Sequence, residues 1–309
     1  MSKPKIIVIT GPTATGKTTL GAMLAKAAGG EVVSADSMQV YKYMDIGTAK
    51  PAAEEMLSVT HHMIDVAEPW ENYSAARYVA DAARCIDDLL SRGKLPVLVG
   101  GTGLYIDSLL SGRSFLARGA PEARAELEAK YDDIGGEAML QKLAGFDPER
   151  AAKLHANDKK RIVRAFEAYK TTEKPISQHD RETKEIPPRY EAVKFALGFS
   201  DRAELYRRID LRVDAMMSKG LEREVRGLLE MGLPPDCTAM QAIGYKEISA
   251  VIRGGLSIGE AVEKIKMESR RYAKRQLTWL RRDETARWIL WEAEPDIESA
   301  VSRLLPEEA

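Results

Sequence analysis

The stretch Gly11-Pro-Thr-Ala-Thr-Gly-Lys-Thr18 has the residue types and the spacing of a phosphate-binding loop. Glycines let the backbone approach a phosphate and turn several N–H groups into one concavity. Lys17 can neutralise diphosphate oxygens, and the Thr18 hydroxyl can hold Mg2+. We therefore expect phosphate oxygens to be bound by the whole loop, namely Gly11, Pro12, Thr13, Ala14, Thr15, Gly16, Lys17 and Thr18.

The default ligand of such a loop is a nucleoside triphosphate, because most proteins that carry it act on ATP or GTP. Two features of the sequence argue against this reading. The apolar stretch Leu95–Val99 leads into Gly100-Gly101-Thr102, where a nucleotide-hydrolysing enzyme usually has an Asp for Mg2+. Asn157-Asp158-Lys159-Lys160 has the wrong order for a guanine-reading Asn-Lys-x-Asp motif. Both weaken the NTPase hypothesis and leave a small-molecule kinase open.

Asp36 and Thr102 are polar residues that should lie beside the phosphate loop. Asp36 follows the apolar run Glu31–Ala35, and open α/β sheets bind ligands at the carboxyl edge of their strands. A carboxylate there could deprotonate a hydroxyl in a kinase or an amine in a transferase. Its structural alternative is a helix N-cap or a turn. Thr102 could stabilise negative charge developing on a leaving phosphate, or simply form a Gly-Gly-Thr turn.

A parallel sheet must bring these residues to one edge. Short apolar runs alternate with helical patterns, which predicts parallel strands covered by helices on both faces. The expected strands are Lys5–Thr10, Glu31–Ala35, Leu95–Val99 and Glu191–Gly198. The expected helices are Lys17–Ala28, Tyr73–Leu90, Ala203–Met231 and Ile258–Arg282, and the tail after Trp291 has too little signal for a prediction.

The predicted fold class is α/β, with a P-loop NTPase-like parallel sheet core and a helical insertion. Residues 113–189 are charged and helical in pattern, without strand signals, and form the expected insertion. Residues 1–112 and 190–309 form the expected core with its C-terminal helices.

Composition limits the kinds of partner. A formal net charge of -1 gives no global positive field, so a nucleic-acid surface must be a local asymmetry. Between Lys264 and Arg287 there are nine Lys or Arg residues against three acidic ones, on a predicted helix. Such density suits a phosphate backbone, and a solvated helix face is the alternative. Tyr272 and Trp279 share one face of that helix and are more typical of core residues than of base-stacking ones.

Cysteine and histidine usage indicates no zinc site. Cys85 and Cys237 are far apart and belong to no Cys/His cluster, so the sequence predicts neither a disulfide framework nor a zinc site, and a reducing cytoplasm fits. His61 and His62 have no evident carboxylate partner and are expected to be structural. No apolar run has the length of a membrane span or a signal-peptide core, so we expect a cytoplasmic protein without a membrane partner.

Six blocks in order resemble the bacterial tRNA dimethylallyltransferase family over roughly residues 5 to 290. The blocks are Gly11–Thr18, Asp36–Tyr41, Met44–Pro51, Gly100–Tyr105, Ala242–Glu247 and Lys274–Arg281. Their order and spacing are far more specific than the phosphate loop alone. The zinc finger of the longer eukaryotic members has no counterpart in this sequence.

The resemblance implies that the loop binds dimethylallyl diphosphate instead of ATP, with Mg2+, and that the insertion holds the anticodon stem-loop of tRNA. Asp36 then matches the general base, Thr102 a threonine near the reacting amine, and Arg212 an arginine that binds the diphosphate. Residues in segments that match RNA-contacting stretches are Asp36, Ser37, Met38, Gln39, Thr102, Lys160, Arg161, Arg164, Gln241, Gly244, Tyr245, Lys246, Lys274, Arg275, Gln276 and Arg281.

Two other functions remain open at this point. One is a P-loop kinase that phosphorylates a small acceptor held by Asp36. The other is an RNA-binding protein whose phosphate loop is a ligand-gated switch. We expect the protein to be a monomer.

Overall fold

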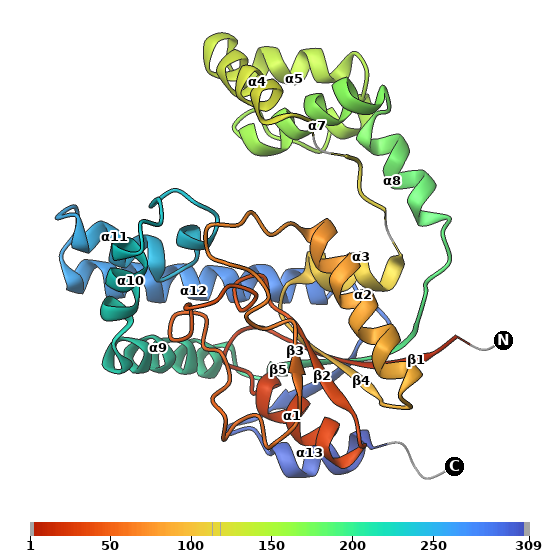
Figure 1. Ribbon diagram of the computed structural model, residues 1–309, viewed down its shortest axis with the longest axis vertical. Coiled ribbons are helices and arrows are strands. Elements are labelled where there is room, and N and C mark those ends of the chain that lie inside the picture. Colours follow the sequence, from red (N-terminus) through yellow and green to blue (C-terminus); the bar gives the residue numbers. More distant parts are fainter. Residues whose placement is uncertain (1–2, 113, 118, 306–309) are drawn as a thin grey trace. The chain divides into compact units, whose positions relative to one another are not determined.

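The computed structural model describes residues 3–112, 114–117 and 119–305 (Figure 1). The chain forms two units by its internal contacts. The sheet unit is Met1–Leu110 with Arg189–Ala309, and the helical unit is Ser111–Pro188. The phosphate loop and Asp36 belong to the sheet unit, whereas the basic segment 160–164 belongs to the helical unit.

Six parallel strands form the sheet, in the order β3-β2-β4-β1-β5-β6. Their bounds are β1 Lys5–Thr10, β2 Glu31–Ala35, β3 His61–His62, β4 Pro96–Gly100, β5 Glu191–Phe199 and β6 Arg287–Trp291. The β-branched sequence of β1 fits a central strand that is buried on both faces. The predicted α/β fold with a parallel sheet is confirmed.

Side chains alternate between two cores, one on each face of the sheet. Ile6 and Val8 of β1 belong to one core, and Ile7 and Ile9 belong to the other. Helices α2, α3 and α12 cover the first face, and α1 and α13 cover the second (Figure 1). The helices of this unit are α1 Lys17–Ala27, α2 Ala75–Ser91, α3 Gly103–Ser111, α9 Arg202–Lys219, α10 Leu221–Glu230, α11 Tyr245–Ile252, α12 Ile258–Leu280 and α13 Ile297–Leu304, with a 3-10 turn at Ala239–Gln241.

Several parts of the sheet unit differ from the sequence prediction, including β3, α3 and α11, which were not predicted. The expected helix from 203 to 231 is divided into α9 and α10, because Gly220 has a φ of 98° and serves as the C-cap of one helix and the N-cap of the next. Strand β6 and helix α13 were not predicted. Strand β6 has only five residues, Arg-Trp-Ile-Leu-Trp, and its place beside β5 depends on pairing that a short local pattern does not encode.

The adjacent histidines form the edge strand β3, and the expectation that they have no carboxylate partner is wrong. The Nε2 atom of His62 lies 2.6 Å from Oε2 of Glu31, the first residue of the neighbouring strand β2. Hydrogen bonds from Arg92 and His62 lower the pKa of Glu31 to about 2, against desolvation that raises it. The pair closes the sheet edge and takes no part in the phosphate site.

The helical unit contains α4 Pro121–Ile134, α5 Gly136–Ala144, α6 Pro148–Ala151, α7 Lys159–Thr172 and α8 Ile176–Lys184. Its core is small, with Phe146 packed edge-on against Phe166 and stacked on Tyr169. Glu167 is buried there and pairs with Arg164 at 3.1 Å and with Arg124 at 3.6 Å. Among the described residues of the whole chain, no helix is both long and apolar enough to cross a membrane.

Candidate functional site

The phosphate loop connects β1 to α1. Hydrogen bonds within the loop, from β6 and from α9 hold its backbone. Thr15 donates its hydroxyl to the Pro12 carbonyl at 2.8 Å within the loop. From β6, the indole of Trp291 donates to the Thr15 carbonyl at 3.1 Å. From α9, Nε of Arg208 donates to the Ala14 carbonyl at 3.3 Å. These bonds orient loop carbonyls toward the protein, which leaves the amides at the start of α1 to face an anion.

Lys17 begins α1 and folds back over the loop, where its Nζ donates to the Pro12 carbonyl at 2.6 Å. Burial, together with the nearby Arg212 guanidinium, lowers the pKa of Lys17 to about 7, and Asp36 opposes the shift. Burial likewise lowers the pKa of Arg212, while Asp36 and Glu55 act to raise it. In the described part of the chain, neither cation has a carboxylate within ion-pairing distance. Two partly buried cations without an ion-pair partner in the described residues make this a site for a strongly charged anion.

Helix α9 explains how Arg212 reaches the loop. Arg208 and Arg212 are four residues apart and therefore lie on one face of the helix. Arg208 contacts the Ala14 carbonyl, and Arg212 approaches Lys17 one turn further on. The helix thus places a second cation near the loop, and diphosphate binding by Arg212 stays a prediction.

Sheet register places Asp36 and Thr102 beside that loop. Gly100 of β4 pairs with Thr10 of β1 on one side and with Ala35 of β2 on the other. The residues that follow these three strands therefore meet at one edge. The Thr102 amide donates to the Ala35 carbonyl at 3.1 Å, and the Thr102 hydroxyl accepts from the Ser37 amide at 3.0 Å.

Asp36 has both a structural contact and a free side. Its Oδ1 accepts from the Met38 amide at 2.8 Å and from the Gln39 amide at 3.3 Å, which is the turn-forming role that was the alternative for this residue. These bonds fix the direction of the side chain. The carboxylate raises the pKa values of Lys17, Arg212 and Tyr272, so it lies near the phosphate loop, α9 and α12.

Gln276 joins the two sides of the site. Its Oε1 accepts from the Thr13 amide at 3.1 Å in the phosphate loop, and its Nε2 donates to the Gly101 carbonyl at 3.0 Å before Thr102. The residue is 6% exposed. A Cβ on Gly101 would lie 2.2 Å from this amide nitrogen, so a glycine is needed at that approach. The sequence segment predicted an RNA contact for Gln276, and the structure places its side chain as a bridge instead.

Tyr272 lies one turn before Gln276 on α12. Burial raises the pKa of Tyr272 to about 12, Asp36 acts in the same direction, and a hydrogen bond with Thr102 opposes the shift. Trp279 packs on the core and donates its indole N–H to Asp107 at 2.8 Å, which is the core role predicted for it. Tyr272 therefore lies near Asp36 and Thr102 in the site.

The basic face of α12 remains available to a polyanion. Lys274 and Arg275 are exposed on the same helix that holds Tyr272 and Gln276. Within the described residues Lys274 has no acidic partner, and the Arg275 guanidinium lies 5.6 Å from the centre of the Tyr272 ring. This part of the predicted RNA surface is therefore exposed and charged, and Arg275 lies beside Tyr272.

Other predicted RNA-contacting residues are partly engaged within the protein. The side-chain amide of Gln39 donates to the carbonyls of Thr48 and Ala49 at 3.3 and 3.2 Å. Its oxygen accepts from the Ser34 hydroxyl. Tyr245 is fully buried, and Gly244 is the buried N-cap of α11. Residues of this group with exposed or partly exposed side chains are Ser37, Met38, Gln241 and Lys246.

The basic segment of α7 is divided in the same way. Lys160 and Arg161 are exposed at the start of the helix. Arg164 instead donates to the carbonyls of Leu116 and Ala117, at 2.7 and 3.2 Å, and pairs with Glu167. Its guanidinium holds the entry segment of the helical unit.

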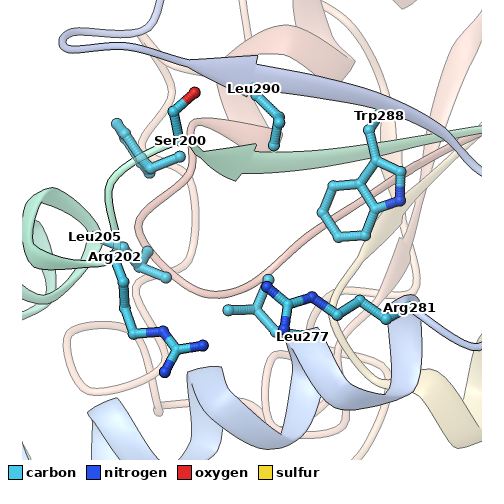
Figure 2. Close-up of a pocket in the computed structure, with 8 residues that line it drawn as sticks. Ser200, Arg202, Leu205, Leu277, Arg281, Trp288 and Leu290 are labelled. Atoms are coloured by element: carbon cyan, nitrogen blue, oxygen red, sulfur yellow. The ribbon is translucent and has the colours of Figure 1, made fainter.

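A separate pocket of about 370 Å3 lies at the ends of β5 and β6 (Figure 2). Trp288 and Leu290 of β6 form one side, and Leu277 of α12 lies opposite. Arg202 and Arg281 also line it, and Figure 2 shows the Arg281 side chain extending toward Leu277. Of the predicted site residues it contains only Arg281, so it is distinct from the convergence of Lys17, Arg212 and Asp36.

The metal-binding capacity of the site is limited to oxygen donors of the loop. Among the described residues no group of three or more His, Cys, Asp or Glu could hold a metal ion. Thr18 is partly exposed at the start of α1, and its hydroxyl has no hydrogen bond within the described residues. A hard cation that keeps several waters and binds through substrate phosphates fits such a donor set, whereas zinc would need a protein cage.

The sheet order and the loop between β1 and α1 define a P-loop α/β protein. The family model for IPP transferase matches residues 39–283, and that for isopentenyl transferase matches residues 4–71. The tRNA dimethylallyltransferase of Acetivibrio thermocellus is 49% identical over 285 residues, covering 92% of this chain and 91% of that protein. The enzyme of the same name from Geobacter sulfurreducens is 46% identical over 301 residues, covering 97% and 96%. The chain therefore belongs to the tRNA dimethylallyltransferase family.

Solved structures agree with this assignment. The tRNA isopentenylpyrophosphate transferase of Bacillus halodurans has a TM-score of 0.72 at 41% identity and covers 98% of this chain and 94% of its own. A eukaryotic dimethylallyltransferase acting on tRNA has a TM-score of 0.76 at 31% identity, covering 90% of this chain and 70% of its own. Members of the family are tRNA prenyltransferases of a type that uses a divalent metal.

Several contacts that shape the site were not visible in the sequence. Trp291 of β6 holds the phosphate loop, and Glu224 of α10 holds the loop that contains Ile46. Neither residue lies in one of the six blocks that resemble the family. Glycines were the sequence feature that could have indicated these close contacts. Gly47 and Gly101 lie where a side chain would collide with Tyr245 and Gln276. A glycine in each block indicates a close approach, but not the residue that approaches.

Proposed function

We propose that this chain transfers the dimethylallyl group of dimethylallyl diphosphate to the exocyclic amine of the adenosine on the 3′ side of the anticodon in tRNA. Diphosphate is released. The observation that carries the proposal is the convergence of Lys17, Arg212 and Asp36 at one sheet edge, in a chain of this family. Two cations suit a diphosphate leaving group, and a carboxylate suits removal of an amine proton.

The donor side lowers the barrier by stabilising the leaving group. As the carbon–oxygen bond of the donor breaks, negative charge grows on the diphosphate. The Lys17 ammonium, the Arg212 guanidinium and the loop amides would hold that charge in a buried site, where their attraction is stronger than in water. The low pKa of Lys17 is a property of the free site, and a bound diphosphate would raise it and keep the ammonium charged.

The acceptor side supplies the base. The lone pair of the adenine amine is delocalised into the ring, so it attacks well only as its proton is removed. Asp36 would accept that proton while the new nitrogen–carbon bond forms, with its direction fixed by the amides of Met38 and Gln39. The Thr102 hydroxyl and Tyr272 lie beside it and would orient the amine. Bond formation, bond breakage and proton transfer then balance without another reactant.

We propose Mg2+ as the divalent metal, held by the Thr18 hydroxyl and by oxygens of the diphosphate. When bound it would neutralise part of the diphosphate charge. The partly exposed Thr18 hydroxyl and the absence of a carboxylate cage in the described residues support this choice over a metal that needs several protein ligands.

Each unit has exposed cations that would suit RNA phosphates. Lys274 and Arg275 of α12 and Lys160 and Arg161 of α7 are exposed and suit contacts to the phosphates of the anticodon arm. Extracting the adenosine from its stack costs a few kcal/mol, less in a single-stranded loop than in a duplex. A protein acting on tRNA in this way is expected in the cytoplasm.

Donor choice tests the proposal. The purified protein would be incubated with Mg2+ and an anticodon stem-loop that has adenosine 3′ to the anticodon, with either dimethylallyl diphosphate or ATP. The digested nucleosides are then weighed. A dimethylallyl-sized gain on adenosine should appear only with the prenyl donor, and Lys17→Ala should nearly abolish it. Phosphorylated product with ATP, without prenylated adenosine, would support the kinase instead.

A further inference from the structure

Glu224, in the first turn of α10, gathers four hydrogen bonds on one carboxylate. Its Oε2 accepts from the amides of Asp45 at 2.9 Å and Ile46 at 2.7 Å. Its Oε1 accepts from the amide of Gly47 at 3.1 Å and from the hydroxyl of Tyr245 at 2.5 Å. Every donor is neutral, and within the described residues Glu224 has no basic partner.

This carboxylate joins two blocks to which the reaction itself assigns no chemistry. One is the loop Met44–Pro51, and the other is the segment Ala242–Glu247 that contains the start of α11. Gly47 is in close contact with the Tyr245 ring, since a Cβ there would lie 2.4 Å from the ring carbon Cε2. Glu224 and this close contact therefore join the two blocks.

The same loop supports the proposed base. The Gln39 side chain donates to the carbonyls of Thr48 and Ala49, directly after the residues that Glu224 binds. The backbone N–H of Gln39 in turn donates to Oδ1 of Asp36. Three sets of hydrogen bonds, joined by short stretches of the chain, thus connect α10 through the loop to the carboxylate of Asp36.

We propose that Glu224 is a positioning residue that sets Asp36 relative to the RNA-contacting start of α11. This inference rests on the proposed function. An ionised carboxylate suits the role, because both oxygens accept two hydrogen bonds and neither needs to donate. In Glu224→Gln one oxygen becomes an NH2 group that faces two N–H or O–H donors, so at least two of the four bonds are lost.

The test compares Glu224→Gln with Glu222→Gln. Glu222 lies in the same turn of α10 but pairs with Arg226 on the surface at 2.8 Å, so its change removes the same charge from the same helix end. The transfer rate is measured in a single turnover with donor and stem-loop saturating. Donor affinity and the hydrogen exchange of the 45–47 amides are measured on the same proteins.

Glu224→Gln should transfer more slowly by up to about 10²-fold, the size of effect expected when a reacting group is misplaced by about 1 Å. Its 45–47 amides should exchange faster, while its donor affinity should match that of Glu222→Gln. A Glu224→Gln rate equal to that of Glu222→Gln would overturn the inference, even if amide exchange were faster, because the loop would then be structural only.

Two further variants keep the result interpretable. Asp36→Asn, measured in parallel, separates the claims: a normal rate there refutes the base assignment, whereas a slow Asp36→Asn with a normal Glu224→Gln refutes only the positioning role. If Glu224→Gln does not fold, Tyr245→Phe removes one of the four bonds and leaves the three amide bonds in place. It should give a smaller loss of rate with the same unchanged donor affinity, and no loss would overturn the inference.

Discussion

Binding of the prenyl diphosphate should weaken as pH rises above 7, because the free protein then loses the Lys17 proton that the ligand needs. Burial lowers the pKa of Lys17 to about 7, so about half of the free protein carries the proton at pH 7 and about one-tenth at pH 8. Binding requires the charged form, so the apparent dissociation constant should rise about fivefold between these pH values and about tenfold over the next unit.

The matched variant is Lys17→Arg, whose guanidinium stays charged over this range. Donor binding would be followed by calorimetry without RNA, at pH 6, 7, 8 and 9 and in two buffers of different ionisation enthalpy. Ionisation of the ligand itself contributes equally to both proteins and cancels in the comparison. The natural protein should take up close to one proton on binding at pH 8 and the variant should not. Identical pH dependences would refute the low pKa of Lys17 and its role in holding the diphosphate.

Three other changes test separate parts of the site. Asp36→Ala should lose about 10²- to 10⁴-fold in single-turnover rate while still binding tRNA in a filter assay, and a near-normal rate would remove Asp36 from the mechanism. Charge reversal at Lys274 and Arg275 should weaken tRNA binding and lower the logarithmic salt slope by roughly 0.7 to 0.9 per lost phosphate contact, whereas an unchanged slope would make this a solvated face. Gln276→Leu should leave the Thr13 amide and the Gly101 carbonyl without their partner, which costs about 1–3 kcal/mol of unfolding free energy per group and should raise the donor KM. Normal denaturant midpoint and KM would show that this bridge is dispensable.

The parts of the site that come from contiguous residues were predictable from the sequence. The loop 11–18 was predictable because its spacing is local, and Asp36 because a polar residue after an apolar strand falls at the carboxyl edge of a parallel sheet. Arg212 came only from the family resemblance, since an arginine in a charged helical segment has no distinctive local pattern.

The contacts that position the site were not predictable in the same way. Gln276 lies 263 residues from Thr13, and Glu224 lies 178 residues from Ile46, so neither contact leaves a periodic signal. The family resemblance also predicted which segments contact RNA, but it did not predict which side chains in them are exposed. Tyr245 and Gln276 are buried in the structure because those segments carry core residues as well as surface residues.

The identity of the bond formed is the most direct test of the account. A stem-loop would be synthesised with 15N only at the exocyclic amine of the adenosine 3′ to the anticodon, and incubated with the protein, Mg2+ and dimethylallyl diphosphate. Released diphosphate is counted, and the product nucleoside is fragmented in a mass spectrometer. We predict one diphosphate for each modified nucleoside, with the prenyl group on the heavy nitrogen, and a near-complete loss of product in Asp36→Ala. Diphosphate release without modified adenosine, or a prenyl group on another atom, would contradict the account.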